Sequence, residues 1–285
     1  MGAQVILSRR GLLGGFAALG LADLGLAAEV TVVSDDLPLA VGDRQTRLFR
    51  LRTERGRPRG VALFSAGHGS WPEKYQRLTS LLAMDGWVVL APLHVDSVRH
   101  PDRAKFTMQA SFGERIADMG AAAAYAARTY PKLPVVAVGH SFGTLTSLCL
   151  GGALDYIGKF RNPAVGAVLG FSTPGRIPGL IQPVAYRSVA EPLMLVTGDA
   201  DRVPGFVTDP ADHLFPADTA PTPTYAWIGG QGGHDLVGED ALLRAWPAAK
   251  LFLAGRGLGD ERAAARLDAW TAAAGDRFVV RKGKA

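Results

Sequence analysis

The sequence has little cysteine, and this excludes several kinds of site. Cys149 is the one cysteine among 285 residues, so the chain cannot form an internal disulfide, a cysteine-rich zinc site or an iron–sulfur cluster. Hydrophobic residues make up 48% of the chain and charged residues 20%, which excludes collagen-like, coiled-coil and disordered chains. The length suits a single α/β enzyme domain with a sizeable core.

Blocks of like charge are also missing. The formal net charge is +5, and no block of five like charges occurs. This mild, dispersed excess does not predict a nucleic-acid partner. It fits solubility, or a weak attraction to anionic surfaces. No internal repeat, low-complexity tract or long linker follows residue 29.

The first 28 residues are typical of an export signal rather than of a folded element. A basic pair, a weakly apolar segment and small residues at 27 and 28 follow one another. Ser8-Arg9-Arg10-Gly11-Leu12-Leu13 resembles the twin-arginine motif, which is read by an export machinery that moves folded proteins. We therefore predict a signal peptide at residues 1–28 and a periplasmic or secreted protein.

Two alternatives to twin-arginine export stay open. The first is an ordinary secretion signal that happens to hold two arginines. The second is an uncleaved membrane anchor, which the sequence favours less. Residues 11–28 include five glycines and are interrupted by Asp23, whereas a spanning helix needs about 20 apolar residues.

Beyond residue 29, strand and helix signals alternate, which predicts βαβ units, a parallel sheet and one α/β domain over residues 29–285. Short apolar runs bounded by Gly or Pro predict buried strands. These strands are expected at Val61–Ser65, Trp87–Ala91, Val135–Val138, Val165–Phe171, Leu193–Val196 and Tyr225–Ile228, the last in the sheet, with Thr46–Arg52 as an edge strand. Helices are expected at Glu73–Asp85, Phe112–Thr129, Phe142–Leu150, 239–254 and 260–274.

A serine lies between one predicted strand and one predicted helix. Gly139-His140-Ser141-Phe142-Gly143 has the pattern G-x-S-x-G in a strand–turn–helix context. The sharp turn strains the serine backbone, and side chains at the two glycine positions would collide with the strand and the helix. The turn exposes the Ser141 hydroxyl and places the Phe142 N–H at a helix N-terminus, where an oxyanion can be held.

The partners that activate such a serine follow in the order acid, then histidine. Asp199 and Asp201 come after the strand at Leu193–Val196, and His234 comes after the strand at Tyr225–Ile228. His234 would take the serine proton, and a carboxylate would orient the imidazole.

These motifs resemble the α/β-hydrolase superfamily over residues 46–258. Gly198-Asp-Ala-Asp-Arg-Val-Pro204 is similar to its acid loop, and this similarity favours Asp201 as the acid and Asp199 as a loop cap. Phe64-Ser-Ala-Gly-His-Gly-Ser70 resembles the branch with predicted dienelactone hydrolases, platelet-activating-factor acetylhydrolases and polyester hydrolases. The resemblance implies His68 as the donor of the second oxyanion-hole N–H. No cofactor is expected, because the triad and the oxyanion hole supply the chemistry. True dienelactone hydrolases use a cysteine nucleophile, whereas this chain has a serine, so a dienelactone is not the expected substrate.

Other polar residues are interpreted as structural. His140 is expected to pack or hydrogen-bond under the turn, and Cys149 to be a buried, inert thiol. His213 is expected at the surface. Arg115 and Asp118 are expected to pair with each other or to tie the end of the sheet to nearby loops. Two imidazoles and a carboxylate at His94, Asp96 and His100 suggest a zinc site, but without a recognisable ligand spacing ordinary hydrogen bonding is favoured, and we predict no metal.

The sequence thus predicts a secreted serine hydrolase that cleaves a small-molecule or lipid-like carboxylic ester through an acyl-enzyme. Its site would comprise Ser141, Asp201 and His234, with the backbone N–H groups of His68 and Phe142 as the oxyanion hole. The segments 171–174 and 203–222 would overhang it. The alternatives are an amidase or peptidase with the same triad, and a non-catalytic binding module on the same fold.

Overall fold

The computed structural model describes residues 4–5 and 30–283. The predicted signal peptide therefore lies outside the described residues, except for the backbone of Gln4–Val5, and its export and cleavage stay predictions. Within the described ranges, no helix combines the length and the apolar character that a membrane crossing requires.

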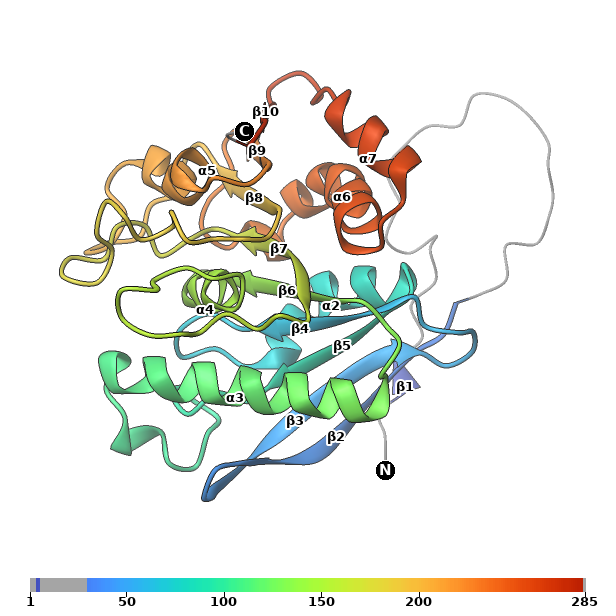
Figure 1. The fold of residues 1–285 in the computed structure, drawn as a ribbon, viewed down its shortest axis with the longest axis vertical. Helices are drawn as coiled ribbons and strands as arrows, with labels where there is room; N and C mark the ends of the chain where they lie inside the picture. The colour runs from blue at the N-terminus through green and yellow to red at the C-terminus, as the bar shows by residue number, and fades with distance from the viewer. Residues whose placement is uncertain (1–3, 6–29, 284–285) are drawn as a thin grey trace.

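One sheet of ten strands runs through the described chain, in the order β1-β2-β3-β5-β4-β6-β7-β8-β9-β10 (Figure 1). The strands from β5 to β9 in this order are parallel, and the flanking pairs on both sides are antiparallel. The strands are β1 (Gln4–Val5), β2 (Val32–Val41), β3 (Arg44–Thr53), β4 (Gly60–Ser65), β5 (Trp87–Pro92), β6 (Val135–His140), β7 (Val165–Phe171), β8 (Leu193–Gly198), β9 (Thr224–Gly229) and β10 (Arg277–Arg281).

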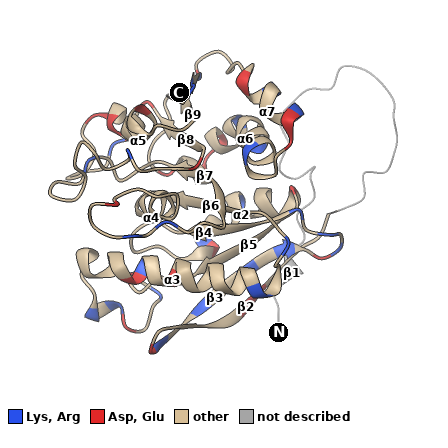
Figure 2. Ribbon diagram, viewed as in Figure 1, with Lys and Arg blue, Asp and Glu red and all other residues tan. Residues whose placement is uncertain are grey.

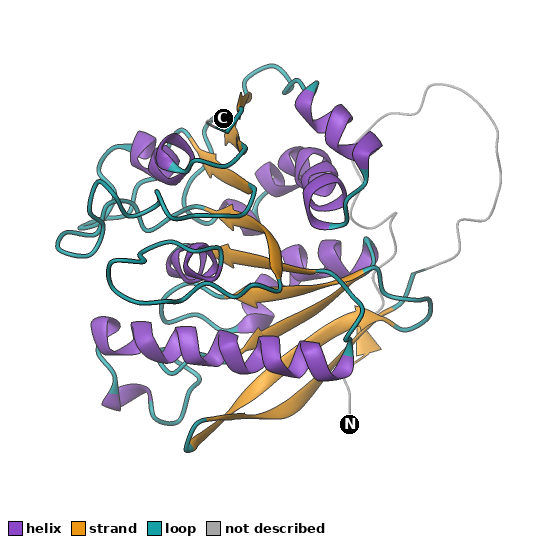
Figure 3. Ribbon diagram, in the orientation of Figure 1, coloured by secondary structure: helices purple, strands orange, loops and turns teal. Residues whose placement is uncertain are grey.

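Helices cover both faces of the sheet (Figure 3). Helices α3, α4 and α5 pack on one face, and α2, α6 and α7 pack on the other. The α-helices are α2 (Gln76–Met84), α3 (Met108–Thr129), α4 (Phe142–Leu150), α5 (Phe215–Thr219), α6 (Asp240–Phe252) and α7 (Glu261–Asp268). Short 3₁₀ turns are η1 (Pro72–Tyr75), η2 (Arg103–Lys105), η3 (Pro210–Leu214) and η4 (Leu236–Gly238), and a π-helical turn, η5 (Leu253–Gly257), follows α6.

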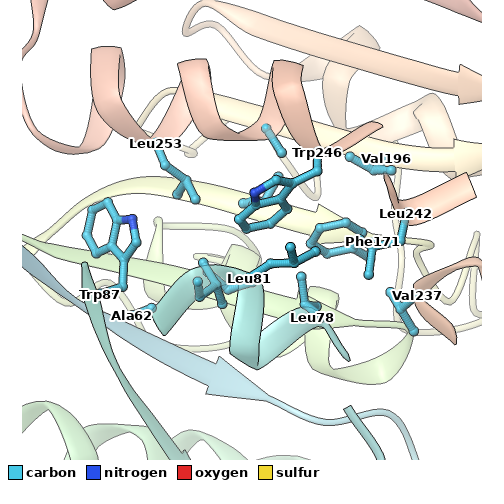
Figure 4. Packing of buried hydrophobic residues seen from close by; sticks show 14 of the residues in the cluster. Ala62, Leu78, Leu81, Trp87, Phe171, Val196, Val237, Leu242, Trp246 and Leu253 are labelled. Carbon is cyan, nitrogen blue, oxygen red and sulfur yellow. The ribbon is translucent and has the colours of Figure 1, made fainter. Parts of the chain in front are cut away.

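The core consists of two hydrophobic clusters, one on each face of the sheet. Successive strand residues point to opposite faces, so Val136 and Val138 of β6 join one cluster while Val135 and Ala137 join the other. Figure 4 shows the first cluster, where Trp246 from α6 and Leu81 from α2 pack over the sheet. The central strands are covered on both sides, which explains their uninterrupted apolar runs.

The predicted edge strand at Thr46–Arg52 is not at an edge. It forms β3, which lies between β2 and β5. Two of its arginines bind acidic residues of the neighbouring strand β2: Arg50 pairs directly with Asp35 and binds its carboxylate, and Arg47 binds the carboxylate of Asp36. Cross-strand ion pairs therefore explain a polar pattern that otherwise indicates solvent on one side.

Besides β1, which falls within the predicted signal peptide, the sequence does not predict two strands at the margins of the sheet. Strand β2 contains Pro38 and two aspartates, which weaken the usual strand signal. The predicted last strand, β9, is followed by β10, a short and partly exposed strand that pairs antiparallel to it. Both additions depend on pairing with a neighbour, which a local pattern does not reveal.

Two predicted helices differ most from the observed bounds. Helix α3 begins at Met108 rather than at Phe112, because the Thr107 side chain accepts a hydrogen bond from the Ala110 N–H and caps the first turn. The last predicted helix, 260–274, ends at Asp268. Basic and acidic residues are interspersed over the elements rather than gathered on one of them (Figure 2).

Candidate active site

Ser141 lies on a sharp turn between β6 and α4. Its φ of 55° and ψ of −121° are rarely adopted by a residue with a side chain. Two backbone hydrogen bonds hold this conformation, because the Ser141 N–H faces the carbonyl oxygens of Phe171 and Ser172 at 3.0 and 2.9 Å. The strain is therefore balanced by contacts with the end of β7.

The two glycines of the turn are required by close backbone contacts. A Cβ atom at position 139 would lie 2.2 Å from the Gly143 carbonyl oxygen, and one at position 143 would lie 1.9 Å from the Ser65 carbonyl oxygen. No rotation of a side chain relieves either contact, since both partners are backbone atoms. The second contact shows that the turn is packed against the end of the neighbouring strand β4.

Ser141, His234 and Asp201 form a continuous hydrogen-bonded chain. The Ser141 hydroxyl lies 2.9 Å from His234 Nε2, and His234 Nδ1 lies 2.8 Å from Asp201 Oδ1. The Asp201 carboxylate accepts a hydrogen bond from Nδ1–H, which leaves the Nε2 lone pair facing the serine hydroxyl. The structure thus brings together three residues that follow β6, β8 and β9.

The Asp201 carboxylate is buried and surrounded by donors. Besides His234, its Oδ2 atom accepts hydrogen bonds from the Ser172 hydroxyl at 2.5 Å and the Thr197 hydroxyl at 2.9 Å. Burial by itself raises the pKa of the Asp201 carboxyl, but the hydrogen bonds from His213, His234 and Ser172 hold the pKa well below its usual range. Asp201 is therefore ionised at neutral pH.

Asp199, the other acid in this loop, forms a hydrogen bond with the loop that carries His234. Its Oδ1 atom accepts a hydrogen bond from the Gln231 N–H at 2.6 Å. Gln231 has a positive φ of 60°, so this bond supports a strained position in the loop that carries His234. In the described part of the chain Asp199 makes no contact with the His234 imidazole.

His213 is the residue for which the sequence-based prediction is wrong. We expected it at the surface, but its side chain is 0% exposed. Its Nε2 lies 3.0 Å from Asp201 Oδ1 and 3.1 Å from the Asp201 carbonyl oxygen. The Pro- and Asp-rich segment around it suggested a solvent-exposed loop, and only the way this segment folds back over β8 buries the histidine.

Asp201, His213 and His234 also place three possible metal-ligand atoms within 4.8 Å of one another. The Thr173 N–H donates to His213 Nδ1 at 2.9 Å. A backbone N–H is only a donor, so Nδ1 must offer its lone pair and the proton of the ring must be on Nε2. His213 therefore turns an N–H, not a lone pair, toward Asp201, and this set does not fit a metal.

The residues His94, Asp96 and His100 do not converge on one point. His94 is buried between Ser65, whose hydroxyl lies 2.8 Å from Nε2, and Asp118, whose carboxylate lies 2.8 Å from Nδ1. His100 accepts a hydrogen bond from the Asp102 N–H. Burial lowers the pKa of both histidines. The favoured interpretation as hydrogen-bonded loop residues agrees with these contacts.

The loop after β4 carries one of the two predicted oxyanion donors. Within residues 30–283, neither the His68 nor the Phe142 backbone N–H donates to a protein acceptor. Both residues line the same pocket as Ser141. The His68 imidazole is partly exposed, and its Nδ1 lies 2.8 Å from Asp96 Oδ2. Two backbone N–H groups without a protein acceptor in these ranges thus belong to residues that line the pocket of Ser141.

The side chain of Arg115 binds the backbone of the loop after β4. Its buried guanidinium donates to the carbonyl oxygens of Ala66 and Gly67 at 2.7 and 3.0 Å, and it forms a two-point ion pair with Asp96. The guanidinium also lies over the Phe142 ring, 4.8 Å from its centroid. Burial raises the pKa of the Asp96 carboxyl, but His68 and Arg115 hold the pKa far below its usual range.

Arg115 and Asp118 were expected to pair with each other or to tie the sheet to nearby loops, and the second alternative is what the structure shows. Asp118 binds His94 and Arg44 instead of Arg115. Asp118 thus joins α3 to the loop after β5 and to β3, and Arg115 joins α3 to the loop after β4.

His140 links the oxyanion loop to the histidine loop. The Gly67 N–H donates to the Tyr75 hydroxyl, which donates to His140 Nδ1, both at 3.0 Å. His140 Nε2–H donates to the His234 carbonyl oxygen at 2.8 Å. Burial lowers the pKa of His140 to about 4, although the hydrogen bond to the His234 carbonyl favours the charged form.

This depressed pKa predicts a pH-dependent stability. Between pH 6.5 and about 4 the unfolded chain takes up a proton that folded His140 does not, so the free energy of unfolding falls as the pH falls, by about 3 kcal/mol. Urea unfolding of the wild type and His140→Gln at pH 7 and 4.5 measures this contribution. The variant should lose less stability on acidification, and equal losses would contradict the prediction. His94 and His100 are present in both proteins and cancel in the comparison.

A pocket of about 280 Å³ opens over Ser141. Apolar side chains form much of its wall, including Met108, Ile177 and Phe206, and polar groups such as Lys74 and Asp235 lie beside His234. The segments 171–174 and 203–222 contribute Pro174, Val203 and Phe206 to the lining, as expected. Cys149 lies elsewhere, buried on α4, and burial raises the pKa of its thiol, so it is an inert core residue.

No protein-family model matches the sequence, and no curated protein is detectably similar to it. Solved structures are similar in fold. An esterase from Pyrococcus furiosus superposes with a TM-score of 0.59 at 15% identity, over 79% of this chain and 93% of that chain. A cold-adapted esterase from an Arctic intertidal metagenomic library gives 0.60 at 14% identity, over 80% of this chain and 94% of that chain.

An acylaminoacyl peptidase from Pyrococcus horikoshii gives a TM-score of 0.61 at 11% identity, over 78% of this chain and 41% of that chain. The narrower resemblance to dienelactone hydrolases, platelet-activating-factor acetylhydrolases and polyester hydrolases stays a prediction. The superpositions and the mostly parallel sheet with helices on both faces confirm the predicted fold class. The chain has the α/β-hydrolase fold.

Proposed function

We propose that the protein is a serine hydrolase that cleaves carboxylic esters through an acyl-enzyme at Ser141. The observation that carries the proposal is the chain from the Ser141 hydroxyl through His234 to Asp201, at 2.9 and 2.8 Å. A strained turn presents this serine in a pocket lined by two residues whose backbone N–H groups have no protein acceptor within residues 30–283. Fold alone does not determine chemistry, but each part that acyl transfer requires is present here.

In the first half-reaction the Ser141 oxygen attacks the ester carbonyl carbon while His234 Nε2 takes the hydroxyl proton. The carbonyl oxygen becomes negatively charged, and the backbone N–H groups of His68 and Phe142, two residues that line the pocket, donate to it. Asp201 stabilises the imidazolium that forms. When the intermediate collapses, the C–O bond to the alcohol breaks, and Nε2–H protonates the departing oxygen.

In the second half-reaction water attacks the acyl-enzyme carbonyl carbon and His234 takes a proton from that water. Collapse releases the carboxylic acid, and the proton returns to the Ser141 oxygen. The apolar wall formed by Met108, Ile177 and Phe206 offers a place for an apolar part of the substrate. These residues support a small-molecule or lipid-like ester as the substrate class.

A fluorophosphonate probe combined with an ester panel tests the proposal. The probe should form one covalent adduct, on Ser141, and the adduct should abolish turnover of nitrophenyl esters ranging from acetyl to long acyl chains. Peptide mass spectrometry locates the adduct. A folded protein that neither reacts with the probe nor turns over any ester would contradict the proposal and favour a non-catalytic binding module.

Matched nitroanilides distinguish esterase from amidase or peptidase activity. The same triad acts on both classes, and one of the structural neighbours is a peptidase. We expect the ester to be the better substrate by kcat/KM. A higher kcat/KM for the anilide of the same acyl group would replace the ester assignment with amide hydrolysis.

A further inference from the structure

We propose that His213 is a positioning residue of the active site, which holds the Asp201 carboxylate in place for His234. The inference rests on the proposed function, because it assigns His213 a role in the same reaction. His213 does not line the pocket over Ser141, so it acts through Asp201 rather than on the substrate.

The first step is that His213 is buried with both ring nitrogens bonded. It lies in η3, between β8 and β9, and its side chain is 0% exposed. On one side of the ring, Nδ1 accepts from the Thr173 N–H at 2.9 Å. On the other side, Nε2 faces Asp201. Full burial of an imidazole requires such partners, because an unpaired ring nitrogen costs free energy.

The second step is that the backbone determines the tautomer. Since the Thr173 N–H occupies the Nδ1 lone pair, the ring proton is on Nε2 and points at Asp201. His213 is thus a constant donor to the acid. His234 differs, because its Nε2 gains and loses a proton during each catalytic cycle.

The third step is that both histidines share one carboxylate oxygen. Oδ1 of Asp201 lies 2.8 Å from His234 Nδ1 and 3.0 Å from His213 Nε2. The two rings are nearly parallel, with 27° between their planes. Oδ2 is occupied by the hydroxyls of Ser172 and Thr197. Rotation of the carboxylate would break its hydrogen bonds to His234, Ser172 and Thr197. It would also disturb the contact with His213 Nε2, which bonds to the Asp201 carbonyl oxygen at 3.1 Å and so holds the backbone of the same residue.

It follows that loss of the His213 donor leaves a lone pair of Asp201 unpaired in a dry environment and permits the carboxylate to turn away from His234. It also raises the pKa of the Asp201 carboxyl, because one of the hydrogen bonds that hold that pKa down is removed. The other titratable side chains around the site, His140 and Asp235, are unchanged by the substitution.

Three variants separate the two contacts of His213. His213→Phe removes both. In His213→Gln the amide nitrogen replaces Nε2 and still donates to Asp201. In His213→Asn the shorter side chain reaches the position of Nδ1 and keeps only the contact with the Thr173 N–H. If His213 only filled space in the core, the activities of these variants would follow how well each new side chain packs, and not whether it donates to Asp201.

We expect His213→Phe and His213→Asn to lower kcat by about 10- to 100-fold, a loss of the size found when the hydrogen-bond partner behind a metal-binding side chain is removed. KM should change little. His213→Gln should recover most of the rate. In an Asp201→Asn background, His213→Phe should cost less than threefold more, since the residue acts through Asp201.

Proton NMR of the downfield region gives a readout that does not need turnover. The His234 Nδ1–H resonance should move in His213→Phe and His213→Asn and should remain in place in His213→Gln. Folded His213→Phe and His213→Asn proteins with the wild-type kcat and the wild-type His234 resonance would overturn the inference. An equal loss in the Asp201→Asn background would also overturn it. The proposed function can fail separately. In that case the wild type itself would hydrolyse no ester, while the NMR comparison would still report on the contact between His213 and Asp201.

Discussion

Ser141→Ala is expected to lower kcat for a short-chain nitrophenyl ester by a factor on the order of 10⁶, the loss found when a triad serine is removed. His234 and Asp201 then have no hydroxyl to activate, and only the oxyanion donors and the pocket remain. The fold should persist, because alanine adopts the same positive φ as serine at this turn with a side chain no larger. Steady-state kinetics and thermal unfolding measure the two effects.

Ser147→Ala is the matched control for this substitution. Ser147 lies on the same helix, is fully buried and has no hydrogen-bond partner for its hydroxyl. Removing that hydroxyl should leave kcat unchanged and should not lower stability, because an unpaired buried polar group is itself unfavourable. Ester turnover by Ser141→Ala close to that of Ser147→Ala would show that Ser141 is not the nucleophile.

Arg115→Met should have the largest effect on stability, lowering the free energy of unfolding by about 3–5 kcal/mol, because it leaves a buried charge uncompensated. Asp96 would keep its position in the interior without its ion-pair partner, and the carbonyl oxygens of Ala66 and Gly67 would lose their donor. The loop that carries the His68 N–H would loosen, so kcat should fall as well. Urea unfolding and ester kinetics check both results.

Arg161→Met provides the comparison. Arg161 is 53% exposed and pairs with Glu191, and an exposed ion pair contributes only about 0–1 kcal/mol. This variant should change stability by less than 1 kcal/mol and should retain full activity. If Arg115→Met were as stable and as active as Arg161→Met, then the buried guanidinium would have no part in holding the oxyanion loop.

The candidate site shows where sequence reasoning works. The turn at Ser141 is specified by residues that are adjacent in the chain, because the glycines at 139 and 143 are the only side-chain choice that avoids backbone contacts of about 2 Å. The order of Asp201 and His234 after successive strands was enough to place them at one edge, since parallel strands end at the same side of a sheet.

The buried polar contacts show what could not be predicted from the sequence. His213 looked like a surface residue because its neighbours in sequence are typical of a loop, yet it is buried against Asp201. The partners of Arg115, too, are 19 to 49 residues away along the chain. Which donor meets which acceptor over such distances depends on how the loops pack on one another, and no local pattern encodes it.

The amino-acid sequence alone determined the α/β class, the strand–turn–helix around Ser141 and the order of the acid and the histidine, because these follow from apolar periodicity and backbone sterics within short segments. Only the tertiary structure decided which strands lie at the margins of the sheet, which oxygen of Asp201 meets which histidine, and how Arg115 and His140 join the loops. Those outcomes depend on the burial of polar groups, and a buried donor or acceptor must find its partner wherever the folded chain places one.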